Sequence, residues 1–156
     1  MNSVKTKVHA AAGIIAFLTI LSFWMSTVLS ELFASYEMIA YVKGMILKGM
    51  FILIPAMAIV GASGMNLGRN RKDAHAIVKK RRMPFIALNG LAILLPAAFY
   101  LQSKAASHSF DTAFYAIQFL ELIAGAFNLS LMGLNIRDGR AMSKRRTQAI
   151  TGNHVP

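Results

Sequence analysis

The sequence predicts an all-α integral membrane protein, folded as an antiparallel bundle of four transmembrane helices with both termini in the cytoplasm. One observation is the composition, since 56% of the 156 residues are hydrophobic and the mean hydropathy is positive. Another is that four apolar runs are long enough to cross a bilayer, at residues 8–29, 39–62, 84–101 and 112–134. Residues 1–136 would then form the transmembrane domain, and residues 137–156 a basic cytoplasmic tail.

The third observation is the distribution of positive charge. The net charge is +11, and 14 of the 17 lysines and arginines lie near the N-terminus, in the second loop or near the C-terminus. The other two loops carry Glu31, Glu37 and Asp111 beside a single basic residue, Lys104. Because basic loops stay in the cytoplasm, this predicts a multi-pass protein of the bacterial inner membrane that contacts anionic lipid headgroups. The basic segment 69–82 has no Phe, Tyr or Trp to stack on bases, so we expect no nucleic-acid binding.

The first apolar run opens with His9, which is followed by small residues. On a helix, Ala12, Gly13 and Ala16 lie one to two turns above His9 on roughly the same side. A strip of small side chains leaves room for a porphyrin over the imidazole, but it is also typical of close packing between membrane helices. Both interpretations stay open. The short segment after this run makes the first and second runs antiparallel neighbours.

The second run contains two lysines and Pro55, which should kink its helix. Lys43 lies close enough to the outer surface to extend its ammonium group into water. Lys48 would lie roughly 8–13 Å below that surface, close to the depth of Glu121 in the fourth run. We therefore predict a contact between Lys48 and Glu121. The alternative is that Lys48 reaches the surface past its neighbours and that Glu121 is protonated.

The third run is predicted to begin at Pro84, since a missing N–H is harmless in the first turn of a helix, and to be kinked by Pro96. Asn89 lies about 8 Å from the cytoplasmic edge, at nearly the depth of Asn128 in the fourth run. A hydrogen bond between these two side chains would hold the two helices together. Two amides that are satisfied separately are the alternative.

The fourth run carries a polar stripe. Six of its residues follow one another at intervals of three or four, and so share one face of a helix: Gln118, Glu121, Gly125, Asn128, Met132 and Asn135. Glu121 is about nine residues into the run, roughly at the bilayer midplane, where a carboxyl group must face protein or water. The prediction is a polar intramembrane seam formed by Lys48, Asn89, Gln118, Glu121 and Asn128. Asp111 is expected to cap this helix, with Phe110 packing on Tyr115.

The motifs of common soluble enzymes are absent, among them HExxH, the P-loop, GxSxG and GxGxxG. The chain also has no cysteine for thiolate chemistry or metal ligation. Only Glu121 offers a metal ligand at mid-membrane depth, so we expect no metal site. The sequence favours a non-enzymatic accessory or assembly subunit, whose polar seam serves within a larger membrane complex or a homo-oligomer.

Two other functions stay open. The first is electron transfer by a b-type haem with His9 as one axial ligand. The second ligand could be no protein group, or one of three residues on the same side of the membrane: His75, Met65 or Met83. Three basic residues there could bind the propionates: Lys79, Arg81 and Arg82. The second function is that of a small proton-coupled carrier or channel in which Glu121 takes up the proton.

A resemblance covers nearly the whole chain, and four segments carry it: KVHAAAG, SFWMSTVLSELF, KKRRMP and FDTAFYAIQFLELIAGAFNLSLMGLNIRDG. They are similar to segments of a group of small bacterial inner-membrane proteins with four helices. The resemblance implies the four-helix membrane fold. It brings no activity and no functional residue to this chain.

Overall fold

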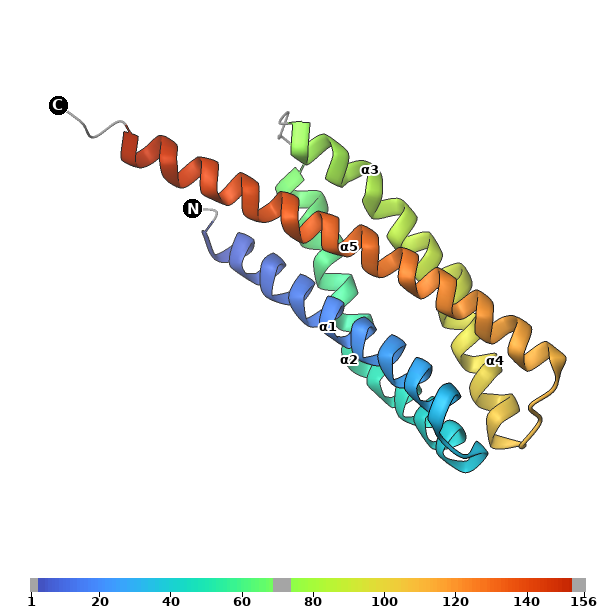
Figure 1. The fold of residues 1–156 in the computed structure, drawn as a ribbon. Coiled ribbons are helices and arrows are strands. Elements are labelled where there is room, and N and C mark those ends of the chain that lie inside the picture. The colour runs from blue at the N-terminus through green and yellow to red at the C-terminus, as the bar shows by residue number, and fades with distance from the viewer. Residues whose placement is uncertain (1–2, 69–73, 153–156) are drawn as a thin grey trace.

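The computed structural model describes residues 3–68 and 74–152, which are almost entirely helical. The elements in chain order are α1 Ser3–Phe33, α2 Tyr36–Gly68, α3 Ala74–Asn89, the π-helical segment η1 Gly90–Leu94, α4 Leu95–Ala106 and α5 Thr112–Gly152. Because α3, η1 and α4 follow one another without a break, the chain forms four helical rods (Figure 1). The predicted all-helical, four-helix fold is confirmed.

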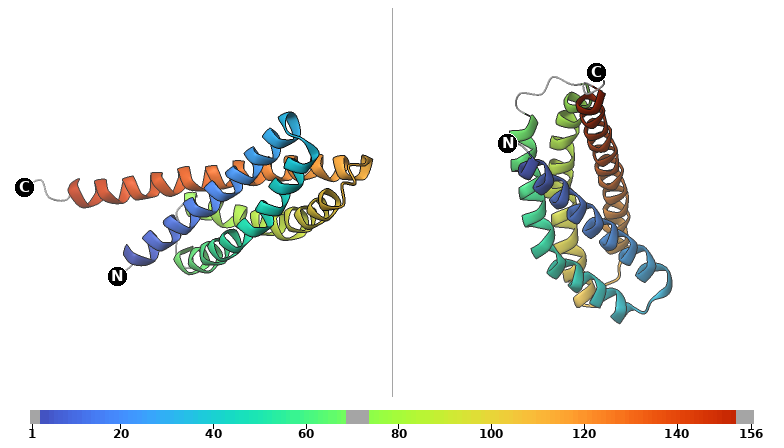
Figure 2. Two further views of the ribbon diagram at one scale, coloured as in Figure 1. Left: turned by 90° about the horizontal axis from the view of Figure 1, so that it is seen from below. Right: turned by 90° about the vertical axis from the view of Figure 1, so that its left-hand side faces the viewer.

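Each of the four rods contains a segment that is long and apolar enough to cross a membrane: Val4–Phe33, Tyr36–Leu67, Ile77–Ala106 and Thr112–Ala141. All four helices extend beyond the predicted runs, because hydropathy marks only the apolar part of a helix whereas polar residues of good helix propensity continue it. α3 begins at Ala74, ten residues before its predicted start at Pro84. α5 runs to Gly152 and extends past the end of α1 (Figure 2), so residues 137–152 of the basic segment are helical.

Each of the four rods packs on two others, and α5 follows the third rod over its whole length. α5 lies against α1, α3, η1 and α4, while α2 packs mainly on α1 and α4 (Figures 1 and 2). One buried apolar cluster lies where α1, α2, α3 and α5 meet: Ala16, Ile20, Ala56, Ile86 and Met132. A second lies between α2, α4 and α5: Ile39, Leu101, Ala105 and Phe114.

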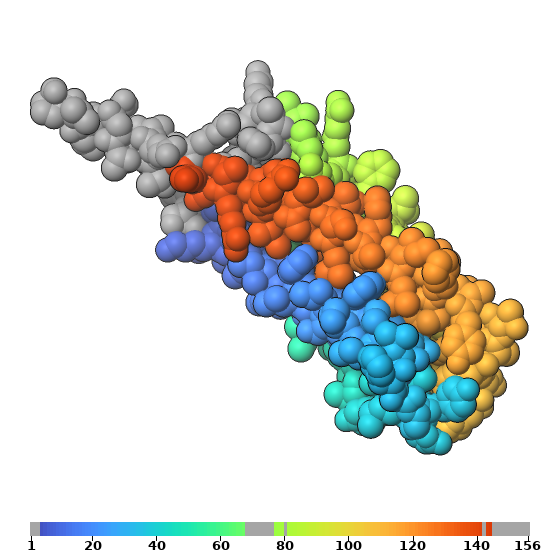
Figure 3. Space-filling model, viewed as in Figure 1, coloured from blue at the N-terminus to red at the C-terminus, as the bar shows by residue number. Residues whose placement is uncertain are grey.

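Large apolar side chains cover much of the outside. Phe51 and Phe33 are more than four-fifths exposed, and many leucines, isoleucines and methionines share this position. The space-filling view shows α1 and α5 packed together on one face of this surface (Figure 3). An exposed apolar area of this extent suits lipid rather than water.

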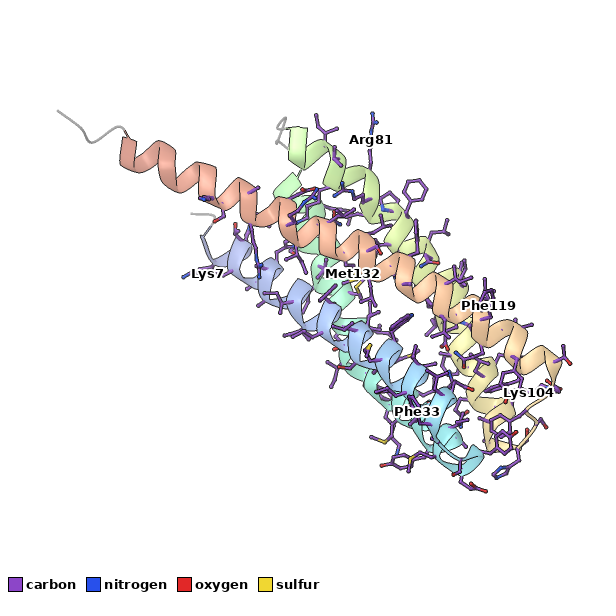
Figure 4. All side chains as sticks on the ribbon, viewed as in Figure 1. Lys7, Phe33, Arg81, Lys104, Phe119 and Met132 are labelled. Atoms are coloured by element: carbon purple, nitrogen blue, oxygen red, sulfur yellow. The ribbon has the colours of Figure 1, made fainter. Side chains whose placement is uncertain are left out.

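The two ends of the bundle hold different parts of the chain. Figure 1 places the N- and C-terminal ends of the chain at the same end, which we call the terminal end, and the α1–α2 and α4–α5 connections at the other, the loop end. Lys7 and Arg81 lie toward the terminal end and Lys104 at the loop end (Figure 4).

The loop end is closed by a capped helix and an aromatic group. Asp111 Oδ1 accepts a hydrogen bond from the backbone N–H of Phe114 (2.9 Å), which confirms the predicted cap of α5. Phe110 does not pack on Tyr115 as predicted, but stacks on Tyr36 at 4.5 Å between ring centroids and meets Phe114 edge-on at 4.9 Å. The α1–α2 turn brings Tyr36 to this place, which the spacing within the fourth run could not show.

The helical turn just before Pro96, in the third rod, is wider than an α-helical turn. The backbone N–H of Leu95 donates to the carbonyl of Gly90, five residues back, in the manner of a π-helix. Pro96 has no N–H to donate and its ring crowds the preceding turn, so a wide turn at this point accommodates it. A Cβ at Gly90 would lie 3.8 Å from Asn128 Nδ2, which places this turn against the polar stripe of α5.

Candidate polar interior and His9 cavity

The polar stripe of α5 faces the interior of the bundle, in agreement with its helical spacing. Gln118, Asn128, Met132 and Asn135 are buried, and the side chain of Glu121 is 14% exposed. α5 packs on α1 and on the third rod, and a side chain of α2, that of Lys43, reaches the same face of α5.

Glu121 forms an ion pair with Lys43 of α2. The Lys43 ammonium nitrogen lies 2.9 Å from Glu121 Oε2, and the Lys43 side chain is 1% exposed. The predicted contact between Lys48 and Glu121 is wrong, because Lys48 is exposed. Five residues of helix turn the two lysines about 140° away from each other. The prediction rested on depth alone, and depth does not show which face of α2 a lysine occupies.

Two further polar groups join this pair. Glu31, from the last turns of α1, is partly buried and interacts electrostatically with both Lys43 and Glu121. Gln118 Nε2 donates to Glu121 Oε2 at 3.1 Å. We call these four residues the Glu121 cluster. It holds two carboxyl groups and one amine, drawn from three helices.

Asn89 and Trp24 fix the neighbouring helices to the backbone of α5. Asn89 Nδ2 donates to the carbonyl oxygen of Ala124 (2.8 Å) and Trp24 Nε1 to that of Leu122 (2.9 Å). The predicted hydrogen bond between Asn89 and Asn128 does not form, because the Asn89 amide reaches the backbone one turn before Asn128. The third rod is nevertheless joined to α5 through Asn89.

Gly125 provides the space that Trp24 occupies. A Cβ built on Gly125 would lie 2.9 Å from Trp24 Cδ1, which is closer than packed atoms allow. The indole of Trp24 therefore packs against Gly125, the position at which the polar stripe has no side chain. This explains why a glycine lies between Glu121 and Asn128.

Four buried side-chain oxygens have no hydrogen-bond partner within the described part of the chain: Glu31 Oε1, Gln118 Oε1, Asn128 Oδ1 and Asn135 Oδ1. All four are acceptors. Three of these residues are more than nine-tenths buried: Gln118, Asn128 and Asn135. A buried acceptor without a hydrogen bond lowers the free energy of unfolding by about 1–3 kcal/mol, so we expect a donor to bind each of these oxygens.

The first cavity, which we call the central cavity, has a volume of about 360 Å³ and lies between α1, α2, the third rod and α5. Its polar lining comes from Trp24, Thr27, Glu121 and Asn128, and most of its remaining walls are apolar. The residues from α4 are Leu95 and Ala98, which bring no charge.

The second cavity, which we call the His9 cavity, has a volume of about 450 Å³ and lies at the terminal end between α1, α2, α3 and α5. This volume is typical of ligand sites. Its polar lining comes from Thr6, His9, Lys79, Asn135, Arg140 and Ser143. Four glycines also line it: Gly13, Gly61, Gly64 and Gly139.

The hydrogen bonds around His9 define its tautomer. Ser63 Oγ donates its one proton to the carbonyl oxygen of Ile59, so it accepts from His9 Nδ1–H at 2.8 Å. His9 Nε2 then carries a lone pair, and the ammonium group of Lys79 donates to it at 3.3 Å. His9 is thereby held in the form in which Nε2 can bind a metal or accept a proton.

Of the side chains described among the predicted second haem ligands, that of Met83 lines the His9 cavity. A Cβ on Gly64 would lie 2.5 Å from Met83 Cε and 3.2 Å from His9 Cε1, so this glycine lets both side chains approach α2. Met65 is 73% exposed and does not line the cavity. His75 lies in the first turn of α3, one turn before Lys79, and its side chain lies outside the described residues.

The three basic residues predicted beside a haem have different surroundings. Lys79 lines the His9 cavity. Arg82 instead binds Asp138, with 2.6 Å between Nη1 and Oδ2, and Arg81 is exposed. Arg140 of α5 lines the cavity and was not among the predicted groups.

Sequence reasoning also missed Glu31 and Ser63. Glu31 lies four residues after Thr27, so the pair marks one polar face at the end of α1, but an acidic residue beside a loop is usually solvated. Ser63 was interpreted only as part of the end of the second helix. That helix continues for another turn, to Gly68, which places Ser63 within hydrogen-bonding reach of His9.

Comparison of the chain with protein families, curated proteins and solved structures gives no match.

Proposed function

We propose that this chain is a multi-pass protein of the bacterial inner membrane, an antiparallel bundle with both termini in the cytoplasm, which binds a b-type haem in the His9 cavity and transfers electrons. The observation that carries the proposal is the imidazole of His9, whose Nε2 lone pair lies in a glycine-lined cavity beside a basic group. The basic residues at the terminal end support the orientation, since positive charge stays on the cytoplasmic side.

The residues of the cavity fit a haem in three respects. His9 Nε2 would ligate the iron, and the bond from Nδ1–H to Ser63 would keep the ring oriented. Lys79, once released from His9 Nε2, would neutralise the propionates together with Arg140, and the thioether of Met83, which lines the same cavity, would supply a second ligand. Gly13 and Gly61 leave uncrowded walls against which a porphyrin could pack, since a Cβ on either would meet no atom closer than 4.0 Å. When bound, the haem supplies one-electron transfer.

The visible spectrum of the purified protein tests the proposal. The protein is produced in haem-replete cells, purified in mild detergent, and measured oxidised and then dithionite-reduced. We expect a sharp α-band on reduction that disappears in His9→Ala and persists in His108→Ala, which changes an exposed histidine at the loop end. A colourless wild-type protein would contradict haem binding, and a band that survives in His9→Ala would contradict the ligand assignment.

One observation favours a second function, that of a non-enzymatic accessory or assembly subunit. Three of the polar contacts of α5 are made within the chain, where they join α1, α2 and the third rod to it through Trp24, Lys43 and Asn89. A stripe used in this way is structural, and the apolar outer surface is then available to a larger membrane complex or a second copy. Under this proposal the protein is colourless and co-purifies in mild detergent with a membrane complex or as a homo-oligomer.

A further inference from the structure

We propose that the interior of the bundle holds a file of water molecules that carries protons between the Glu121 cluster and the His9 cavity. This inference does not rest on haem binding, because it depends on the polar stripe of α5 and the two cavities. The water file would make the protein a proton pathway across the part of the membrane that the bundle spans.

The unpartnered oxygens define the path. Glu31 Oε1 and Gln118 Oε1 belong to the Glu121 cluster, Asn128 Oδ1 to the wall of the central cavity and Asn135 Oδ1 to the wall of the His9 cavity. Each of them needs a donor, and water is a donor small enough to reach all four. Each of these oxygens can accept one O–H of a water molecule from the side, which leaves the other O–H to donate to the next water, so the file can keep the single orientation that proton transfer requires.

The spacing of the stripe suits such a file. Glu121, Asn128 and Asn135 are seven residues apart, or two turns, which is about 10.5 Å along α5 at each step. Hydrogen-bonded oxygens are about 2.8 Å apart, so roughly three waters bridge each step. The volumes of the central cavity and the His9 cavity, about 360 and 450 Å³, exceed what these waters need.

An apolar constriction separates the two cavities. Both are lined by Met57 and Ile86, and the buried cluster that includes Ile86 and Met132 lies between Asn128 and Asn135. Apolar constrictions of this kind interrupt a water file by excluding water from it. Methionine side chains are flexible, so Met57 and Met132 can move aside to let the two halves of the file join.

The Glu121 cluster can take up a proton without leaving a buried charge unpaired. When Glu121 accepts the proton it becomes neutral, and Glu31, which also interacts with Lys43, remains as the counter-charge of the ammonium group. The other group facing Glu121 from α5 is Gln118, and α4 presents only Leu95 and Ala98 to the central cavity. At the other end of the path, the lone pair of His9 Nε2 can receive the proton.

Proton flux into proteoliposomes tests the inference. Vesicles that contain the protein and a trapped pH-sensitive dye are given a potassium diffusion potential with valinomycin, and protein-free vesicles give the leak. We expect vesicles with either protein, wild type or Met132→Ala, to acidify several-fold faster than protein-free vesicles. Met132→Ala should be the faster of the two, because its constriction is smaller. If neither exceeds the protein-free rate, the inference is wrong.

Two further variants show whether flux follows the proposed path. Asn128→Leu removes the middle acceptor without changing charge and should lower flux at least tenfold, whereas Asn66→Leu, at an exposed asparagine on α2, should leave it unchanged. The double variant Lys43→Gln/Glu121→Gln keeps polar side chains at the ion pair and should abolish flux. Gel filtration and the thermal midpoint establish that each variant is folded. Flux that is equal in wild type, Asn128→Leu and the double variant would overturn the proposal.

Discussion

The ammonium group of Lys43 lies in a place where almost no solvent reaches it. A buried amine is costly, and its neighbour Glu121 offsets this cost with a contact of 2.9 Å, while Gln118 donates to the same carboxyl oxygen. Breaking such a pair by removing one partner costs more than the pair contributes, because the other charge is left behind. The stability of the bundle should therefore depend on which lysine of α2 is changed.

Replacing Lys43 by methionine should destabilise the protein by about 3–5 kcal/mol, because Glu121 then stays buried without its cation. Lys48→Met is the matched control, since Lys48 is exposed, and should have little effect. SDS-induced unfolding in mixed micelles measures both. Equal destabilisation by the two substitutions would mean that Lys43 does not pair with Glu121.

Two close approaches position α1 on its neighbours. The ring of Trp24 fills the space above Gly125 of α5, and that of Phe23 fills the space above Gly49 of α2, where a Cβ would lie 2.5 Å from Phe23 Cζ. Each glycine leaves room for an aromatic ring, and the two rings come from the same turn of α1. The two rings thus set the distance of α1 from both α2 and α5.

Gly125→Ala should force the indole of Trp24 to shift and should cost about 1–3 kcal/mol, the usual range for overpacking. Gly44→Ala is its control, because nothing lies within 4 Å of a Cβ at Gly44 and the substitution can only improve helix propensity. Trp24 is the only tryptophan in the chain, so its fluorescence reports directly on this contact. An unchanged emission spectrum in Gly125→Ala would contradict the packing described for the indole.

The start of α5 should respond to acid through Asp111. The hydrogen bond from Lys104, followed by that from the Phe114 N–H, lowers the pKa of Asp111 below its ordinary value. A carboxyl group with a lowered pKa contributes stability above its unfolded-state pKa of about 4 and loses that contribution as the pH falls through the folded-state pKa. The thermal midpoint of wild type should therefore exceed that of Asp111→Asn near neutral pH and approach it in strong acid. A difference that is constant with pH would contradict this.

The helices were predictable from the sequence, whereas their ends and contacts were not. Apolar runs of spanning length are a strong signal, and the interval of three or four residues from Gln118 to Asn135 identified the inner face of α5. The second run is apolar on all sides, so nothing in it showed that Lys43 rather than Lys48 faces inward. Ser63 could be connected with His9 only after the full length of α2 was known, because the contact joins residues 54 positions apart.

The two ends of the bundle differ in the charges that they carry. Basic side chains such as Lys7 and Arg81 lie toward the terminal end, and acidic residues such as Glu37 and Asp111 lie at the loop end. If the terminal end is cytoplasmic, both ends of the chain are in the cytoplasm and the loops after α1 and α4 face the periplasm.

The absence of native cysteine makes this orientation simple to test. Ser107→Cys, at the loop end, should react with a membrane-impermeant maleimide in intact cells, whereas Lys144→Cys, near the end of α5, should react only after the inner membrane is permeabilised. Both positions are exposed, so access of the reagent does not depend on unfolding. The opposite labelling pattern would reverse the proposed orientation.

The length of α5 gives the molecule a mechanical property. From Glu121 to Gly152 the helix continues for 31 residues, about 46 Å, and its final turns extend beyond the end of α1. If the helix pivots by about 5° at Glu121, geometry alone moves the far end by about 4 Å. If α5 moves as a rigid rod, a small rearrangement around Lys43 and Glu121 would therefore displace the far end of the helix by several times as much.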